Sequence, residues 1–353
     1  MRVLHVLHSM NLGGVETLLA ELFRRLDSTD PQFDFLVFTP APMYFEAELL
    51  AGGARIFRLP DLRSNPIGFQ KRLRRFFKEH SAYTIVHSHL ETTTGVILAA
   101  AKQAGIPVRI AHSHNTRYPP ANFAVRLLKD ACKKKINPAA TVRVACSRAA
   151  AVWLYGTDQN VVILPNGVDL QKCRFSVEAR KAARAHLGIA QNERLFLHVG
   201  RFQPQKNHAF LLEAWRLAAI PCAKLALAGD GELRPRLEAN APPNTVFLGL
   251  RGDVPALLAA ADVFVLPSLF EGLPVSLVEA QASGLPCLIS AFVPTDGLTQ
   301  NITVLPLNVS AWAHELQNTA AQCEDIRLRA YQNIPQYDIN HTLQKLKALY
   351  EIV

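Results

Sequence analysis

Short apolar runs alternate along the first half of the chain with longer stretches in which apolar residues recur every three or four positions. The short runs predict strands buried on both faces, and the longer stretches predict helices that cover them. The predicted strands of this half are 3–7, 35–39, 55–59, 85–87 and 108–112. Strands that alternate with helices are typical of a parallel, doubly wound sheet. The pattern therefore predicts an α/β fold.

The same alternation starts again after residue 160, with apolar runs near residues 195, 224, 246 and 263. A chain of 353 residues is longer than one hydrophobic core usually supports, so we expect two domains. A content of 49% hydrophobic and 19% charged residues is typical of a soluble globular protein. No apolar run reaches the roughly 18–20 residues that a bilayer crossing needs.

The N-terminus and the cysteines indicate the cellular compartment. The stretch from Met1 to Met10 is too short for a signal peptide and lacks a small-residue cleavage site, so we interpret it as a first buried strand. The six cysteines show no paired spacing, and we expect them to be reduced. These features predict a cytoplasmic protein.

The net charge of +9 is concentrated in the first half, where residues 1–170 hold 21 Lys and Arg against 13 Asp and Glu. The densest basic run is 71–78, which also contains Leu73, Phe76 and Phe77. One interpretation is a basic amphipathic helix that contacts an anionic membrane. The other is a solvated helix whose apolar residues face its own core. Nucleic acid is disfavoured as a partner, because aromatic residues are few and no motif that recognises it is present.

The stretch 261–280 combines a buried strand, a turn and a helix. Val263–Leu266 is the apolar run of the strand, and 271–274 has the composition of a turn. A helix that begins after a glycine turn presents free backbone N–H groups and the positive end of its dipole, which together suit an anion. Glu271 and Glu279 lie eight residues apart, near one face of the predicted helix.

The segment from Glu271 to Glu279 resembles the E-x7-E motif of family 4 of the retaining glycosyltransferases, which have the GT-B fold and use nucleotide sugars. The resemblance implies two Rossmann-like domains with doubly wound parallel sheets that face each other across a cleft. It also implies a C-terminal helix that crosses back to the first domain. We therefore expect an N-terminal domain at 1–168 plus 336–353 and a nucleotide-sugar-binding domain at 169–335.

A second motif supports this resemblance. The loop after the strand near residue 195 contains Gly200, Arg201 and, five positions later, Lys206, which match the family's G-R-x-x-x-x-K signature. Two cations at the carboxyl end of a strand suit a diphosphate, because arginine can span two oxygens and lysine acts as a point charge. By resemblance, Arg201, Lys206 and Glu271 are catalytic residues, and the two cations neutralise the departing diphosphate.

The resemblance also assigns the remaining donor contacts. Glu279 would hold the ribose hydroxyls and Glu271 the hydroxyls of the donor sugar. The full set of expected donor-binding residues is Gly13, Gly14, Arg201, Lys206, Leu250, Arg251, Glu271, Gly272, Leu273 and Glu279.

Two predicted strands end in histidine pairs, His87 with His89 and His112 with His114. Residues two apart on a strand point to one face, so each pair can direct both rings the same way. Metal binding is disfavoured, because no carboxylate or thiol is spaced to complete a site. Packed, hydrogen-bonded histidines are a second interpretation. By resemblance, one histidine lines the catalytic cleft, and we assign this role to His114, with His112 as the alternative.

The chain contains no D-x-D triplet, which argues against a metal-dependent transfer, so we expect no metal and no cofactor.

The segment 291–297 differs from the usual family pattern and is similar to the branch of capsular and exopolysaccharide assembly. The resemblance implies a hexosyltransferase that uses a nucleotide sugar, with UDP as the expected nucleotide, and a glycan or lipid-linked acceptor at the inner membrane face. Alternatives are an epimerase or phosphorylase of the same fold, or a membrane- or sugar-binding module without activity. A Rossmann dehydrogenase is disfavoured, because no glycine fingerprint follows the first strand.

Overall fold

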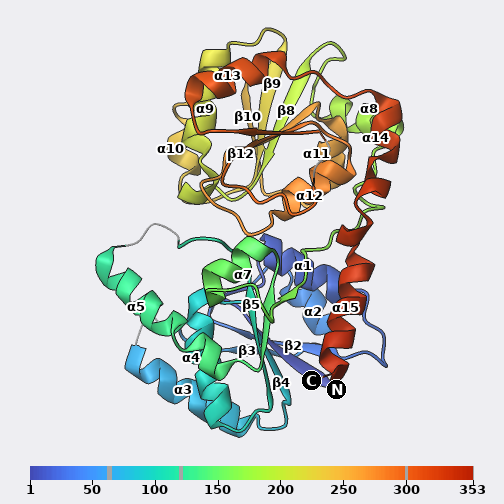
Figure 1. Cartoon of the computed structure of the whole chain (residues 1–353). Coiled ribbons are helices and arrows are strands. Elements are labelled where there is room, and N and C mark those ends of the chain that lie inside the picture. The colour runs from blue at the N-terminus through green and yellow to red at the C-terminus, as the bar shows by residue number, and fades with distance from the viewer. Residues whose placement is uncertain (62–65, 119–121, 299–300, 353) are drawn as a thin grey trace. The chain divides into compact units, whose positions relative to one another are not determined.

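The computed structural model describes residues 1–61, 66–118, 122–298 and 301–352, and the chain divides into two compact units (Figure 1). Unit 1 comprises Met1–Asn166 and Ile339–Val353, and unit 2 comprises Gly167–Asp338. Each unit is built on one parallel sheet covered by helices, and the last helix of the chain belongs to unit 1. The predicted α/β architecture of two doubly wound sheets is therefore confirmed.

Unit 1 contains a seven-stranded sheet in the order β3-β2-β1-β4-β5-β6-β7, and the strand pairs in its described part are parallel. The strands are β1 (Arg2–Val6), β2 (Gln32–Val37), β3 (Ile56–Arg58), β4 (Ile85–Ser88), β5 (Val108–Ser113), β6 (Val142–Ala145) and β7 (Val162–Ile163). The helices are α1 (Gly14–Phe23), α2 (Glu46–Ala51), α3 (Pro66–Glu79), the 3-10 turn η1 (Glu91–Thr93), α4 (Thr94–Gln103), α5 (Phe123–Lys133), α6 (Ile136–Ala139), α7 (Arg148–Tyr155) and α15 (Ile339–Ile352).

Alternation along the strands of unit 1 separates two faces of the sheet. On one face, strand residues such as Val3, Phe35 and Ile110 pack in a common apolar cluster with α1 and α15. The last helix of the chain therefore completes the core that the first strand begins. On this same face, the positions near the carboxyl ends of β1, β4 and β5 are occupied by histidines instead of aliphatic residues.

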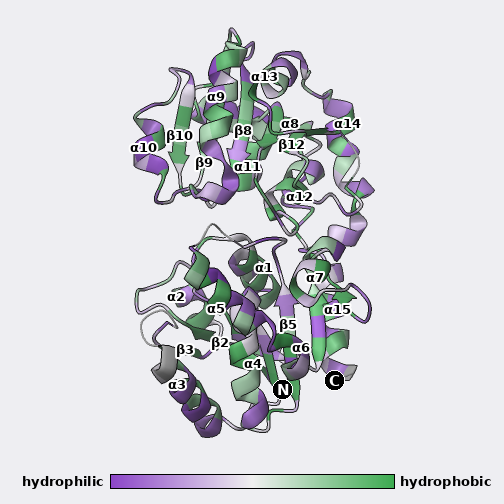
Figure 2. Cartoon of the chain, turned by 60° about the vertical axis from the view of Figure 1, so that its left-hand side comes forward, coloured by the Kyte–Doolittle hydropathy of each residue, from purple (hydrophilic) through white to green (hydrophobic). Residues whose placement is uncertain are grey.

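Helix α3 decides between the two interpretations of the basic run 71–78. Leu73, Phe76 and Phe77 are all buried, while the lysines and arginines of the run make the helix mostly hydrophilic (Figure 2). The apolar side of α3 therefore packs within the protein, and these residues do not form a membrane-facing surface. None of the described helices combines the length and the apolar composition that a membrane crossing needs.

Unit 2 contains a six-stranded parallel sheet in the order β10-β9-β8-β11-β12-β13. The strands are β8 (Arg194–Val199), β9 (Ala223–Ala228), β10 (Thr245–Gly249), β11 (Val263–Leu266), β12 (Cys287–Ser290) and β13 (Ile302–Leu305). The helices and 3-10 turns are α8 (Val177–His186), η2 (Pro204–Lys206), α9 (His208–Ala218), α10 (Arg234–Glu238), α11 (Val254–Ala260), α12 (Val275–Ala282), α13 (Val309–Asn318), α14 (Glu324–Arg329), η3 (Ala330–Asn333) and η4 (Pro335–Tyr337).

Several helices begin at a residue whose side chain satisfies a free backbone N–H group. The side-chain oxygen of Asn122 accepts a hydrogen bond from the third residue of α5, and Ser147 does the same for α7. Ser176 and Asn308 cap α8 and α13 in the same way. Such caps stabilise a helix by about 1 kcal/mol each, which explains why these helices start where they do.

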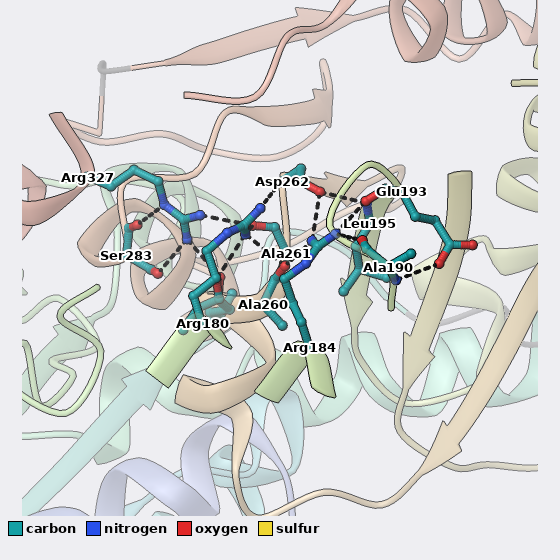
Figure 3. Close-up of polar contacts among 12 residues, drawn as sticks. Arg180, Arg184, Ala190, Glu193, Leu195, Ala260, Ala261, Asp262, Ser283 and Arg327 are labelled. Carbon is teal, nitrogen blue, oxygen red and sulfur yellow. Dashed lines mark hydrogen bonds and ion pairs between the residues drawn. The ribbon is translucent and has the colours of Figure 1, made fainter. Parts of the chain in front are cut away.

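A buried charge network joins the amino ends of β8 and β11 (Figure 3). Asp262, directly before β11, accepts hydrogen bonds from Arg180 and Arg184 and, over 2.7 Å, from the backbone N–H of Leu195 in β8. Arg327 donates to the carbonyl groups of Leu258 and Ala261 at the end of α11. Carbonyl groups at a helix C-terminus carry partial negative charge, so they offset the excess of arginines over carboxylates. The network therefore holds β8 and β11 in place at the ends opposite to their carboxyl loops.

Candidate active site

Both sheets contain a point at which the strand order reverses. In unit 2 this point lies between β8 and β11, and in unit 1 it lies between β1 and β4. In open α/β sheets, ligands bind outside the carboxyl ends of the strands at such points. The loops that follow these four strands are therefore candidate binding loops.

The loops after β8 and β11 bring Lys206 and Glu271 into direct contact. The ammonium Nζ of Lys206 donates a hydrogen bond to Oε1 of Glu271 over 2.7 Å. The two side chains are only 14% and 7% exposed. Lys206 ends the turn η2, and Glu271 lies between β11 and α12. Two residues that the sequence assigned to the donor site thus form a shielded ion pair at the point where the strand order reverses.

Gln205 and Asn207 tie the same two loops together, and sequence reasoning missed both. The Nε2 group of Gln205 donates to the carbonyl of Phe270 over 3.0 Å and to Oε2 of Glu271 over 3.2 Å. The side chain of Asn207 donates to the carbonyl of Pro267 over 3.3 Å. Both residues flank Lys206, so their position in the loop was the only available signal. The bond from Gln205 orients the Glu271 carboxylate, and the bond from Asn207 joins the two loops.

Two glycines allow the loops around Lys206 to approach closely. A Cβ atom on Gly229, whose φ is +140°, would lie 2.1 Å from the carbonyl oxygen of Gly200. A Cβ atom on Gly200 would lie 3.0 Å from Cε of Lys206. Larger residues at these positions would push the lysine stem and the β9 loop apart. The glycines are therefore part of the geometry that places the ammonium group.

The turn before α12 supplies backbone to the same region. Gly272 and Leu273 are buried, and Glu279 is half-buried in α12. Pro274 is the last residue before the helix, and α12 begins at Val275. The first backbone N–H groups of a helix lack acceptors within the helix and carry partial positive charge. The amino end of α12 therefore adds to the positive potential beside Lys206.

The other three expected donor contacts of unit 2 are more open to solvent. Arg201 is exposed, and Leu250 is 59% exposed in the loop after β10. The guanidinium of Arg251 donates to the carboxylate of Asp253, with Nε and Oδ1 separated by 2.7 Å. These residues stay predicted contacts.

In unit 1 the glycine loop after β1 leads directly into α1. Gly13 is the N-cap of this helix, and its carbonyl accepts a hydrogen bond from the backbone N–H of Thr17 over 2.9 Å. Gly14, the first helical residue, is exposed. The loop therefore presents a helix amino end at the point where the strand order of unit 1 reverses, which is the setting expected for a phosphate contact.

His112 and His114 are both buried at the carboxyl end of β5. Their ring centroids are 3.9 Å apart. Burial lowers the pKa of His114 to about 3, and an interaction with Asn166 opposes this shift in part. The pKa of His112 is also well below its usual value because of burial. Both rings are therefore neutral at pH 7, and both stay candidates for the predicted catalytic histidine.

The structure gathers five histidines of unit 1 into two overlapping groups of three. His5, His87 and His89 form one group, and His89, His112 and His114 form the other, with potential ligand atoms within 4.8 Å of one another. Three imidazoles are a ligand set that zinc accepts. Most of these ring nitrogens, however, already lie 2.9–3.1 Å from a neighbouring ring nitrogen, which is a hydrogen-bonding distance.

Glu91 lies beside these histidines and was not singled out from the sequence. Its Oε1 accepts a hydrogen bond from the backbone N–H of His114 over 3.0 Å. Among the described residues, its buried Oε2 has no hydrogen-bond partner. Burial raises the pKa of Glu91 to about 8, and the bonds from His114 and Asn115 oppose this shift in part. The side chain is therefore mostly protonated at pH 7.

The chain matches the sequence profiles of two families. A profile described as Glycosyltransferase Family 4 matches residues 12–172, and one described as Glycosyl transferases group 1 matches residues 193–322. EpsF of Bacillus subtilis (strain 168) is 38% identical to the chain, over 99% of this chain and 96% of EpsF. The UDP-Gal:alpha-D-GlcNAc-diphosphoundecaprenol alpha-1,3-galactosyltransferase of Escherichia coli is 29% identical, over 85% of this chain and 82% of that enzyme.

Solved structures with the same fold include glycosyltransferases. Anabaena HepE in complex with UDP and glucose superposes with a TM-score of 0.80 and 19% identity over the whole of both chains. WaaG, a glycosyltransferase involved in lipopolysaccharide biosynthesis, gives a TM-score of 0.71 and 17% identity, over 98% of this chain and 99% of WaaG. At these identities the likeness concerns the fold.

Proposed function

The chain belongs to family 4 of the glycosyltransferases, and from this premise we propose that it transfers a hexose from a UDP-sugar to a lipid-linked glycan. The transfer retains the anomeric configuration of the sugar and uses no divalent cation. The observation that carries this proposal is the shielded contact between Lys206 and Glu271 where the strand order of unit 2 reverses.

The diphosphate leaving group is stabilised by fixed positive groups. Before the donor binds, the charge of Lys206 is balanced by Glu271 at 2.7 Å. When the donor enters, the ammonium and the guanidinium of Arg201 meet the phosphate oxygens, together with the amino end of α12. Groups held in place before the reaction stabilise developing charge without reorganising, which is usually the largest single catalytic contribution. Glu271 then contacts the sugar hydroxyls, while Gln205 holds its carboxylate.

The donor and the acceptor are proposed from the relatives and from one segment of the chain. The E. coli relative named above uses UDP-Gal and a diphosphoundecaprenol-linked GlcNAc. HepE, which shares the fold, is solved with UDP and with UDP-glucose. The segment 291–297 is similar to the exopolysaccharide branch of the family. A UDP-hexose and a polyprenyl-diphosphate glycan in polysaccharide assembly therefore suit this chain best.

An acceptor of this kind lies at the membrane, and α5 supplies the surface that contacts it. Phe123, Leu127 and Leu128 are 81%, 62% and 46% exposed on this helix. Arg126 in α5 and Lys134 directly after it are also exposed, so this segment carries both apolar and basic residues (Figure 2). Inserting apolar side chains contributes about 1.5–3 kcal/mol each, and each nearby cation about 1 kcal/mol at an anionic leaflet. α5 thus replaces the run 71–78 as the proposed contact with the inner membrane face.

The decisive experiment is a transfer assay with a panel of UDP-, GDP- and dTDP-sugars and a polyprenyl-diphosphate glycan acceptor. We expect one UDP-hexose to give a product whose new bond has the anomeric configuration of the donor, determined by proton NMR coupling constants. An isomerised nucleotide sugar formed without acceptor identifies an epimerase instead. Strict dependence on inorganic phosphate identifies a phosphorylase, and the absence of turnover with all donors identifies a binding module.

A further inference from the structure

Six buried side chains of unit 1 are joined by hydrogen bonds into one continuous chain. We call these residues the histidine–tyrosine chain. The first two links join Nε2 of His114 to Nδ1 of His89 (2.9 Å) and Nε2 of His89 to Nδ1 of His5 (3.1 Å). The next two pass through the hydroxyl of Tyr350, which lies 3.5 Å from Nε2 of His5 and 2.7 Å from Nδ1 of His87. The fifth link joins Nε2 of His87 to Nδ1 of His112 (3.1 Å).

The parallel sheet produces this arrangement. His5, His87 and His112 lie on the adjacent strands β1, β4 and β5, and residues two apart on a strand share a face. His89 and His114 lie two residues after His87 and His112, just after the last residues of β4 and β5, and therefore share their face of the sheet. Tyr350 comes from α15, which packs on this face. The planes of the directly bonded rings differ by 17°, 18° and 29°, so neighbouring rings are close to parallel.

The rings of the histidine–tyrosine chain carry no charge at pH 7. Burial lowers the pKa of His5 and His114 to about 3 and lowers the pKa of the other three histidines well below the usual value. Burial also raises the pKa of Tyr350, which keeps its hydroxyl protonated. A neutral imidazole has one N–H donor and one acceptor nitrogen, and a phenol has one O–H donor. The six groups therefore hold six polar hydrogens.

Each link needs one hydrogen between its two atoms, because two hydrogens would collide and two lone pairs would repel each other. A neutral ring that donates its N–H to one neighbour has only an acceptor nitrogen for the other neighbour. Every ring between two neighbours therefore donates to one of them and accepts from the other. Every histidine in the interior of the chain uses Nδ1 toward one neighbour and Nε2 toward the other. If the Tyr350 hydroxyl donates to one of its two neighbouring rings and accepts from the other, only two arrangements satisfy all five links. In one, all five rings are protonated on Nδ1, and in the other, all five are protonated on Nε2. If both rings donated to the hydroxyl oxygen instead, its buried hydrogen would point away from both rings.

The two end residues of the histidine–tyrosine chain, His114 and His112, lie beside each other, and one presents a hydrogen-bond donor while the other presents an acceptor. Nδ1 of His114 and Nε2 of His112 take no part in the five links, and the two ring centroids are 3.9 Å apart. The side chain of Asn166 also interacts with His114. In the first arrangement His114 presents an N–H group and His112 a lone pair. In the second arrangement these roles are exchanged. The end nitrogens are therefore one donor and one acceptor in either case.

We propose that the histidine–tyrosine chain gives its five histidines a common tautomer and thereby determines whether Nδ1 of His114, the nitrogen outside the five links, is a donor or an acceptor. His5, His87, His89, His112 and Tyr350 are then positioning residues that act through His114. The consequence for catalysis rests on the proposed function and on the prediction that His114 is its catalytic histidine. A donor N–H at this position binds a sugar or phosphate oxygen, whereas a lone pair binds only a hydroxyl hydrogen.

A metal ion would use the same nitrogens in a different way. Zinc held by His89, His112 and His114 requires a lone pair from each ring at one point. Nδ1 of His89 and Nε2 of His114 instead face each other at 2.9 Å, as a donor and an acceptor do. The hydrogen-bonded chain accounts for every ring nitrogen except the two end nitrogens, and it needs no ion.

Nitrogen-15 NMR of protein labelled at the histidine rings tests the proposal directly, because protonated and unprotonated ring nitrogens have distinct chemical shifts. We expect five neutral rings with one shared tautomer, all Nδ1–H or all Nε2–H, in a protein purified with no added metal. The exposed His8, His186 and His314 serve as internal controls for rings outside the histidine–tyrosine chain. Mixed tautomers among the five rings would overturn the proposal, and so would metal-shifted nitrogens with stoichiometric zinc in elemental analysis.

Tyr350→Phe provides the second arm, because it removes the central hydroxyl and keeps the ring. The hydrogen bonds on the two sides of residue 350 then no longer share one direction of donation. We therefore expect His114 and His112 to adopt tautomers independently in the NMR spectrum. With the donor and acceptor of the transfer assay, we expect kcat to fall at least about tenfold while the KM for the donor stays within about twofold. Tyr331→Phe, at a partly exposed tyrosine of unit 2, is the matched control for loss of a hydroxyl.

Failure of this inference and failure of the proposed function give different results. If the five rings share a tautomer but the wild type transfers no sugar, the histidine–tyrosine chain stands and the function is wrong. If the wild type transfers sugar but the rings have mixed tautomers, the function stands and the tautomer proposal is wrong. A Tyr350→Phe variant that keeps the shared tautomer also contradicts the proposal, because the hydroxyl would then not couple the tautomers of the rings on its two sides.

Discussion

Lys206 and Glu271 are 65 residues apart in the chain, yet the ammonium of one lies 2.7 Å from the carboxylate of the other at the carboxyl ends of β8 and β11. Each charge is shielded from solvent, so neither is solvated well in the absence of its partner. A buried ion pair of this kind is weak evidence for stability, because desolvation opposes the attraction. Its position where the strand order reverses is better explained by the binding of a charged ligand.

We expect Lys206→Ala or Arg201→Ala to lower kcat at least about 100-fold, the scale for loss of one group that stabilises developing charge. The measurement is turnover of the UDP-sugar with the lipid-linked acceptor. Lys181→Ala, at an exposed lysine of α8, is the control and should leave kcat unchanged. Normal turnover by either active-site variant would show that the leaving group is stabilised elsewhere.

Removal of divalent cations should leave transfer intact, because Lys206, Arg201 and the amino end of α12 already supply the positive charge. The rate with excess EDTA should lie within about twofold of the rate with added Mg²⁺ or Mn²⁺, well below the factor of 10 that 1.4 kcal/mol corresponds to. Inactivation by the chelator, with recovery on addition of Mg²⁺ or Mn²⁺, would contradict the metal-independent mechanism.

Phe123→Asp and Leu127→Asp should reduce binding to vesicles that contain phosphatidylglycerol, because each removes an apolar contact and adds a repulsive charge. We expect each substitution to lower the partition coefficient at least about tenfold in sedimentation assays, equivalent to about 1.4 kcal/mol. Leu217→Asp is the matched control, since Leu217 is an apolar residue of α9 in unit 2 that is 54% exposed. Equal binding by all three variants and the wild type would exclude α5 as the contact surface.

Glu91 should make the protein less stable as the pH rises. Its pKa is about 8 in the folded protein and about 4.3 in an unfolded chain. Between these values the folded state holds a proton that the unfolded state has released. The free energy of unfolding therefore loses up to about 1.4 kcal/mol per pH unit from this group.

Glu91→Gln removes this dependence and keeps the shape of the side chain. We expect the stability difference in favour of Glu91→Gln to grow from pH 5 to pH 8 in denaturant unfolding curves. Glu79→Gln is the control, because Glu79 is about half exposed and pairs with Arg75 on the surface. A constant difference across this range would show that Glu91 is ionised in the folded protein.

Asp262→Ala should destabilise unit 2 by about 3–5 kcal/mol, because it leaves the buried Arg184 and the largely buried Arg180 without a carboxylate. The substitution also removes the acceptor for the backbone N–H of Leu195. Glu238→Ala breaks a half-exposed pair with Arg234 and should cost no more than about 1 kcal/mol. Similar denaturation midpoints for the two variants would mean that the network in Figure 3 contributes little.

The boundaries of the strands show how far the sequence pattern reaches. The pattern placed the second strand at 35–39, whereas β2 runs from Gln32 to Val37. The difference arises because Asp34 is fully buried inside the strand, where Arg2, the backbone of Arg55 and the hydroxyl of Tyr83 satisfy its carboxylate. In a sequence pattern, a charged residue marks the end of a predicted buried strand, because the groups that pair with its charge are not visible in the sequence. The short strand β6 (Val142–Ala145) was not predicted, since its four residues include an arginine.

Local sequence was sufficient wherever one segment carries the whole signal. The buried run Val263–Leu266, the turn after it and the helix α12 follow from residues that are neighbours in the chain. The same holds for Gly200, Arg201 and Lys206, which share one loop. These segments determined the fold class and the candidate donor site, because strand burial, turn composition and helix starts depend on residues a few positions apart.

Tertiary structure alone decided the features that join distant segments. It directed the apolar side of α3 inward, brought Gln205 to Glu271, and placed Tyr350 against His87, 263 positions away. The order in which the strands lie side by side, and the helices that pack on each face, determine such contacts. A one-dimensional pattern shows that a residue faces inward, but the residue it meets there depends on how the whole chain closes around the core.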